Sequence, residues 1–165
     1  MSQRILRWTV LCMALLALPP ATHAQTSPYR YTVPQGWTRS VADGTESFAP
    51  ASEPADTAQI VLLPLKPLQG ALQGAFDAER MSLESGWGLA APQAAPPQAG
   101  RFGDLSYAAH YASYDSAAGA RYLAFMGMAH NGRLAMLVFV AATPEAFNRL
   151  APQAAALLQS LRIAP

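Results

Sequence analysis

The chain has 165 residues, with 11 basic and 10 acidic side chains and a formal net charge of +1. A charge this close to zero provides no electrostatic footprint for nucleic acid or for an anionic lipid surface. The single cysteine, Cys12, lies near the N-terminus, so the rest of the sequence offers neither a disulfide nor a catalytic thiol.

Residues 1–24 have the pattern of a secretory signal peptide. Two arginines precede an apolar run over 8–18, which is too short to cross a bilayer as a helix. Small residues then lead to Ala24, where we predict cleavage. The prediction is therefore one exported domain over 25–165, periplasmic or secreted, with no transmembrane segment after cleavage of the signal.

The residues that follow alternate between strand-rich and helical stretches. The hydrophobic periodicity predicts strands at 29–33, 38–42, 45–49 and 58–65, a helix at 68–85, strands at 105–114, 121–130 and 133–142, and a helix at 144–161. Asp43-Gly44 and Asn131-Gly132 are typical two-residue hairpin turns, because both positions tolerate a positive φ. Thr143 is suited to cap the last helix, which contains Pro152 on its polar side.

The stretch 88–100, GLAAPQAAPPQAG, has no hydrophobic period and contains three prolines. We expect it to be a flexible surface loop.

The two long strands at 121–130 and 133–142 are apolar on both faces, and a sheet of that kind needs cover on both sides. Two amphipathic helices are available for this. The predicted fold class is therefore α+β, with an antiparallel sheet covered by helices on both faces as an α/β/α sandwich.

Two segments carry a resemblance to a known family. YTVPQGW (31–37) and LLQSLRI (157–163) resemble the first and last segments of PsbP-like domains, whose fold is shared with Ran-binding Mog proteins and bacterial DcrB-like proteins. The resemblance covers about 29–163. It implies a mostly non-catalytic role as an assembly factor, binding module or chaperone, and it implies no shared active-site residues.

No motif for catalysis or cofactor binding is present in the sequence. After the signal peptide the histidines are His110 and His130, and the spacings of zinc sites, P-loops and nucleophile elbows are missing. We therefore predict no catalytic residue and no cofactor. A hydrolase with His110 or His130 as the base of a dispersed triad is the first alternative.

A copper site in the segment 126–136 is the second alternative. With Asn131-Gly132 as the turn, Met126, Met128 and His130 share one face of the hairpin and Met136 lies on the other. Strand geometry leaves only Met128 and His130 close enough to share an ion, beside the charge of Arg133. The same segment is explained by two core methionines and a histidine next to a turn.

Trp87, His110 and Tyr114 are the candidates for a ligand or partner surface. Trp87 follows the first predicted helix, and the other two share one face of the strand at 105–114. Core packing is the alternative role for all three, since large aromatic side chains usually bury their area. The sequence thus favours an exported, non-enzymatic binding or chaperone-type domain whose partner in the cell envelope is an unknown protein or small molecule.

Overall fold

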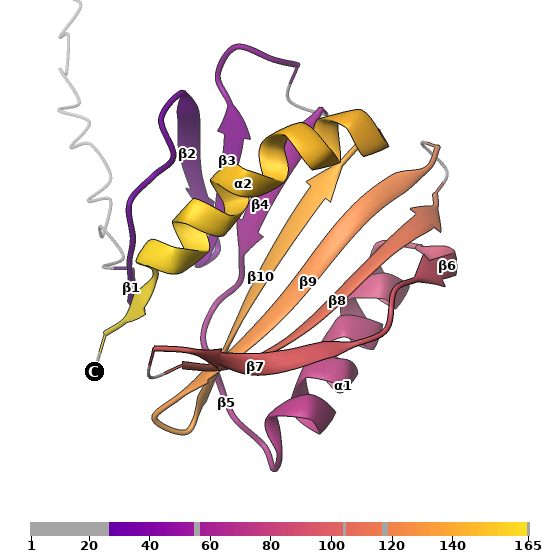
Figure 1. The fold of residues 1–165 in the computed structure, drawn as a ribbon. Helices are drawn as coiled ribbons and strands as arrows, with labels where there is room; N and C mark the ends of the chain where they lie inside the picture. The colour runs from indigo at the N-terminus through magenta and orange to yellow at the C-terminus, as the bar shows by residue number, and fades with distance from the viewer. Residues whose placement is uncertain (1–26, 55–56, 104, 117–118, 165) are drawn as a thin grey trace, which may run out of the picture.

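The structure is a computed structural model that describes residues 27–54, 57–103, 105–116 and 119–164. The predicted signal peptide lies outside the described residues. Within them the structure has two helices, a two-stranded ribbon and a nine-stranded antiparallel sheet. The helices are α1 (Leu72–Gly86) and α2 (Pro144–Ser160). The predicted class, α+β with an antiparallel sheet, is confirmed (Figure 1).

The main sheet has the strand order β2-β3-β4-β10-β9-β8-β6, with β5 paired to β10 and β7 to β8. Its strands are β2 (Trp37–Ala42), β3 (Thr45–Pro50), β4 (Ala58–Leu62), β5 (Lys66–Pro67), β6 (Ala90–Ala94), β7 (Gln98–Phe102), β8 (Leu105–Asp115), β9 (Arg121–His130) and β10 (Arg133–Ala141). The separate ribbon pairs β1 (Tyr29–Arg30) with β11 (Arg162–Ile163), which brings the two ends of the domain together.

The hairpin of β9 and β10 forms the centre of the sheet in the predicted register. His130 faces Arg133, and Met128 faces Ala135. Asn131 and Gly132 adopt φ values of 48° and 70°, as a type I′ turn requires. This register puts alternate residues of the hairpin on opposite faces of the sheet.

Helix α1 begins four residues later than predicted. The backbone of Lys66 and Pro67 pairs with β10, and the Leu68 amide donates to the Gly132 carbonyl at 2.8 Å. Gly70 then takes a φ of 72°, which turns the chain before the helix starts. Helix α2 begins as predicted, because the Thr143 hydroxyl accepts from the Ala146 amide at 3.1 Å. Pro152 lies on its exposed side.

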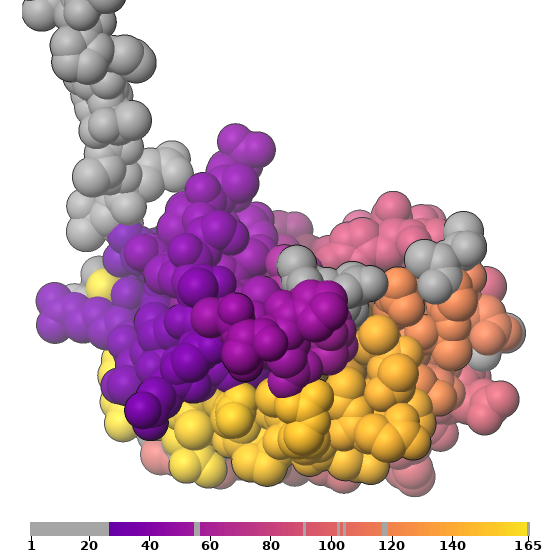
Figure 2. All heavy atoms as spheres, turned by 90° about the horizontal axis from the view of Figure 1, so that it is seen from above, coloured from indigo at the N-terminus to yellow at the C-terminus, as the bar shows by residue number. Residues whose placement is uncertain are grey.

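Two sets of buried side chains pack on the sheet, and they alternate along β10. Ala135, Leu137 and Phe139 pack with α2 residues such as Leu157, whereas Leu134, Met136 and Val138 pack with Phe76 of α1. We call the corresponding sides of the sheet the α2 face and the α1 face. Figure 1 shows α2 in front of the sheet and α1 behind it, and Figure 2 shows α2 along one side of the molecule beside β2–β4.

The prediction of a loop without secondary structure at 88–100 is wrong. Strand β6 and most of β7 fall in this stretch, and both pair with β8. Edge pairing needs only backbone groups, so the lack of a hydrophobic period does not prevent it. Pro92 has no N–H to donate, and the register shifts between Ala90 and Gln93, as expected where a proline interrupts an edge strand.

Candidate binding groove

A groove opens on the α2 face where the sheet extends beyond the helix. Two adjoining hollows of about 150 and 180 Å³ share Tyr111, Met126 and Leu158. A third, of about 240 Å³, shares Tyr111 and Phe147 with the second. We call the first two the α2 groove, lined by Gln98, Leu105, Tyr107, Tyr111, Ala124, Met126, Met128, Leu137, Phe139, Phe147, Ala151, Ala154, Ala155 and Leu158.

The floor of the α2 groove follows from strand register. Tyr107 pairs with Met128, Ala109 with Met126, and Tyr111 with Ala124 across β8 and β9. Cross-strand partners project from the same face of a sheet. The alternation on both strands therefore places two tyrosines and two methionines side by side on the α2 face.

One wall of the groove is the side of α2 that faces β8. Phe147, Ala151, Ala154, Ala155 and Leu158 recur at helical spacing and line it. The three alanines keep the helix surface low between the two larger side chains. The space is thus a consequence of small residues on α2 over strands that carry large ones.

The other wall is β7, which Gly100 allows to lie close to Tyr107. A Cβ at position 100 would stand 3.0 Å from both Cε1 and the hydroxyl oxygen of Tyr107. That distance is shorter than an ordinary van der Waals contact. The glycine therefore permits a close approach that lets Gln98 of β7 line the groove.

The groove is apolar apart from a few groups. Burial raises the pKa of Tyr111, and the nearby Tyr107 raises it further, so the Tyr111 phenol stays neutral at ordinary pH. No hydrogen bond to either hydroxyl is made by the residues that the structure describes. These hydroxyls and the Gln98 amide can therefore bond a ligand, and the lining otherwise contributes only hydrophobic contact.

Met128 and His130, the candidate copper ligands, lie on the α2 face as the register predicted. Met128 is 2% exposed and lines the groove, while the His130 ring is 3.1 Å from the Asn131 amide nitrogen. Within the described ranges there is no group of three or more His, Cys, Asp or Glu side chains placed to hold a metal ion. Copper binding stays a prediction.

Trp87, His110 and Tyr114 come together on the α1 face, around Phe125. The Trp87 ring stacks on Phe125 at 6.3 Å, and Tyr114 meets it edge-on at 6.2 Å. His110 is the cross-strand partner of Phe125. Trp87 remains 41% exposed and lines a shallow hollow with Leu89. The role of these residues as a ligand surface stays a prediction.

A partly buried polar network joins α1 to β8. The Tyr114 hydroxyl donates to Glu84 at 2.5 Å, and Arg80 also bonds Glu84. The Nε2 atom of His110 is buried and has no hydrogen-bond partner among the residues that the structure describes. Burial lowers the pKa of His110 and the charge of Arg80 lowers it further, which keeps the imidazole neutral. Neither His110 nor His130 lines the α2 groove.

The α2 groove was not predicted from the sequence. The alternation of Tyr107 and Tyr111 with small residues on β8 is one signal, and the alanines at 151, 154 and 155 are another. Their combination becomes informative only when the register brings β9 beside β8 and the fold places α2 above them.

Several solved structures are similar to this chain. LpqN, involved in cell envelope biogenesis of Mycobacterium tuberculosis, has a TM-score of 0.63 at 18% identity, over 83% of each chain. The cyanobacterial PsbP of Synechocystis has a TM-score of 0.60 at 10% identity, over 83% of this chain and 87% of its own.

The Saccharomyces cerevisiae Ran-binding protein Mog1p has a TM-score of 0.58 at 10% identity, over 82% of this chain and 90% of its own. No protein-family profile and no curated protein sequence matches the chain. The resemblance expected from YTVPQGW and LLQSLRI is confirmed for the fold: the chain has the PsbP/Mog1-like fold.

Proposed function

We propose that this chain is an exported, non-catalytic binding domain that holds the apolar part of a small-molecule ligand in the α2 groove. The observation that carries the proposal is the groove itself, an apolar space between α2 and β7 with tyrosine hydroxyls at its floor. With the adjoining third hollow, its volume falls in the range of about 300–1,000 Å³ that is typical of ligand sites.

The shape of the groove favours an alkyl chain or an aromatic ring over a flat protein surface. The lining is concave and bounded on both sides by secondary structure, so a slender apolar group gains contact with both walls. Each methylene removed from water there contributes about 0.8 kcal/mol. Tyr107, Tyr111 and Gln98 would orient a polar group of the same ligand.

The architecture and the location belong to the same proposal. We infer that α1 and α2 cover opposite faces of the sheet as an α/β/α sandwich, which leaves the groove as the uncovered part of one face. The signal-like composition of residues 1–24 supports export, as does the fold similarity to a protein involved in cell envelope biogenesis. Among the described helices, none has the length and apolarity needed to cross a membrane.

The test uses the neutral fluorescent probe N-phenyl-1-naphthylamine and its displacement by decan-1-ol. Ala155 is exposed on α2 and lines the groove, while the neighbouring Ala156 is exposed and does not. Ala155→Leu adds three carbons to the space. If they displace three methylenes of ligand, affinity falls by about 2.4 kcal/mol, or roughly 50-fold.

Ala156→Leu is the matched control, since both substitutions have the same small effect on helix propensity. It should bind the probe like the wild type. Saturable binding that Ala155→Leu weakens and Ala156→Leu does not supports the proposal. Absence of saturable binding, or equal binding by the two variants, contradicts it. Export is tested separately by N-terminal sequencing of the protein from the periplasm and medium, where the expected first residue is Gln25.

A further inference from the structure

A separate hollow on the α2 face, of about 300 Å³, has three charged side chains in its lining. It lies beyond β10, near the turn between β2 and β3. We call it the arginine pocket, defined by Arg39, Glu46 and Arg133 with an apolar wall of Val41, Pro64 and Leu65. Arg39 pairs with Phe48 and Glu46 with Leu62, both members of the α2-face core. None of these residues lines the α2 groove.

Glu46 lines the arginine pocket, and its carboxylate is held by hydrogen bonds from neighbouring side chains. It is 2% exposed, and its carboxylate accepts from the hydroxyls of Ser27 and Tyr31 and from Arg39 Nε at 2.7 Å. Burial opposes ionisation, but these hydrogen bonds outweigh it and lower the pKa of Glu46. The carboxylate is therefore a fixed negative charge that neutralises Arg39.

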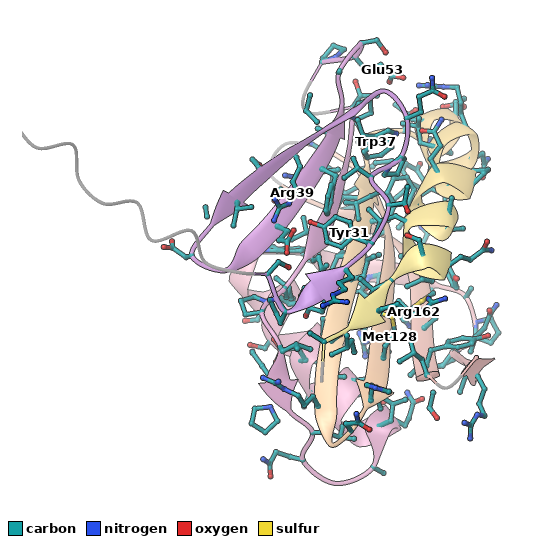
Figure 3. All side chains as sticks on the ribbon, turned by 90° about the vertical axis from the view of Figure 1, so that its left-hand side faces the viewer. Tyr31, Trp37, Arg39, Glu53, Met128 and Arg162 are labelled. Carbon is teal, nitrogen blue, oxygen red and sulfur yellow. The ribbon has the colours of Figure 1, made fainter. Side chains whose placement is uncertain are left out.

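Arg39 keeps part of its guanidinium available. Its Nε is used by Glu46, and its plane lies over the Tyr31 ring, 5.9 Å from the centroid. Figure 3 shows Tyr31 and Arg39 beside each other, away from Trp37, which bonds Gln153 of α2. A guanidinium carries five N–H donors, so its contacts with Glu46 and Tyr31 leave further N–H groups of Arg39 for a ligand. Glu46 thus holds the guanidinium of Arg39, which lines the pocket.

Arg133 supplies a charge that nothing in the described residues neutralises. It is exposed at the start of β10, and it forms no ion pair or hydrogen bond through its side chain with those residues. Its positive charge also acts on the Tyr29 phenol. Burial and Glu46 raise the pKa of Tyr29, and the charge of Arg133 offsets part of that increase. With Arg39 and Glu46 cancelling, the arginine pocket carries one net positive charge.

The rest of the lining is mostly apolar and partly open, and Val41 lies beside Glu46 as its cross-strand partner. Val41 is 47% exposed although it is a β-branched aliphatic residue, and Pro64 and Leu65 continue the surface beside it. A small ligand that bears one anionic group and one aliphatic group would match both the charged and the apolar part of the lining. Two guanidinium groups are well suited to a carboxylate, which they can bond through parallel N–H donors.

We propose that the arginine pocket binds a monoanionic carboxylate that carries a branched aliphatic group. A free organic acid and the C-terminal residue of a peptide share this chemistry. The site is separate from the α2 groove, and its occupation does not depend on the function proposed above.

The experiment measures binding by isothermal titration calorimetry at low ionic strength. The probes are 4-methylpentanoate and N-acetyl-alanyl-leucine, each compared with its uncharged amide. Because charge-assisted hydrogen bonds are lost in the amide, at least one acid should bind about tenfold or more tightly than its amide. Binding of 4-methylpentanoate alone identifies a free acid as the ligand source, and binding of the peptide acid identifies a peptide C-terminus.

Arg133→Gln should weaken acid binding about tenfold or more, while Arg133→Lys, which keeps the charge but loses the planar fork, should weaken it less. Arg101→Gln on β7 is the control and should have no effect. Circular dichroism checks that each variant is folded. Equal binding of acids and amides, no binding of either acid, or undiminished binding by Arg133→Gln would overturn the proposal. Ala155→Leu should not alter acid binding, which separates this test from that of the groove.

Discussion

Gly127→Ala is a direct test of how α1 sits on the sheet. Gly127 lies in β9 between Ala108 and Met136, and a Cβ there would stand 2.7 Å from Phe76 Cδ2 and 3.3 Å from Met136 Sδ. Carbon atoms pack best at about 3.5–4.0 Å, so the Phe76 contact would be roughly 0.8 Å too short. Phe76 is the one fully buried residue of α1, so the ring cannot move away without shifting the helix.

The expected cost of Gly127→Ala is about 1–3 kcal/mol, as for other overpacked cores. Tm should fall by about 4–12 °C, measured by thermal and urea unfolding. Gly74→Ala in α1 is the matched control, because a Cβ there meets nothing within 4 Å. It should stabilise the protein by about 0.5–1 kcal/mol through helix propensity.

A smaller residue at position 76 should relieve the same clash. In a Phe76→Leu background, Gly127→Ala should therefore cost at least about 0.5 kcal/mol less than it does alone. If Gly127→Ala is as stable as the wild type, then Phe76 of α1 does not pack closely against Gly127, whatever the double variant shows.

Three further predictions concern the stability contributed by single side chains. Glu46→Gln should lower the free energy of unfolding by about 1–3 kcal/mol, because it removes charged hydrogen bonds to a buried carboxylate; an unchanged urea midpoint would contradict this. Because the pKa of His110 is lowered in the folded protein, His110 of the unfolded chain takes up its proton at a higher pH than His110 of the folded chain. Stability should fall as pH drops below about 6.5, and His110→Gln should reduce that slope; an equal slope in both proteins would refute it. Trp87→Ala should cost about 1 kcal/mol by loss of the stack on Phe125, and a neutral effect in urea titration would argue against that stack.

The local features of the fold were predictable because short-range chemistry sets them. Asn131-Gly132 fixes the central hairpin and its register, and Thr143 with the following Pro144 fixes the start of α2. The register also determined which methionines share a face. Each of these features is determined by the residues directly next to one turn or one helix cap, so the local sequence is enough to predict it.

Features that depend on distant pairing were missed. Strands β6 and β7 bind β8 through backbone groups, which Ala-, Pro- and Gln-rich sequence does not reveal. The late start of α1 depends on Lys66 and Pro67 pairing with β10. The α2 groove depends on three separate arrangements: β7 must pack close to Tyr107, α2 must present alanines, and β9 must pair with β8. The arginine pocket likewise combines residues from four separate parts of the chain.

Ligand binding in the α2 groove is tested most directly by NMR of methionine methyl groups during titration with decan-1-ol. Met126 and Met128 line the groove, whereas Met136 packs on the α1 face and Met81 is exposed on α1. We predict saturable shifts of the Met126 and Met128 methyl signals with little change at Met81 and Met136. Shifts confined to Met81 or Met136, or no saturable shift at Met126 and Met128, would contradict the proposed function.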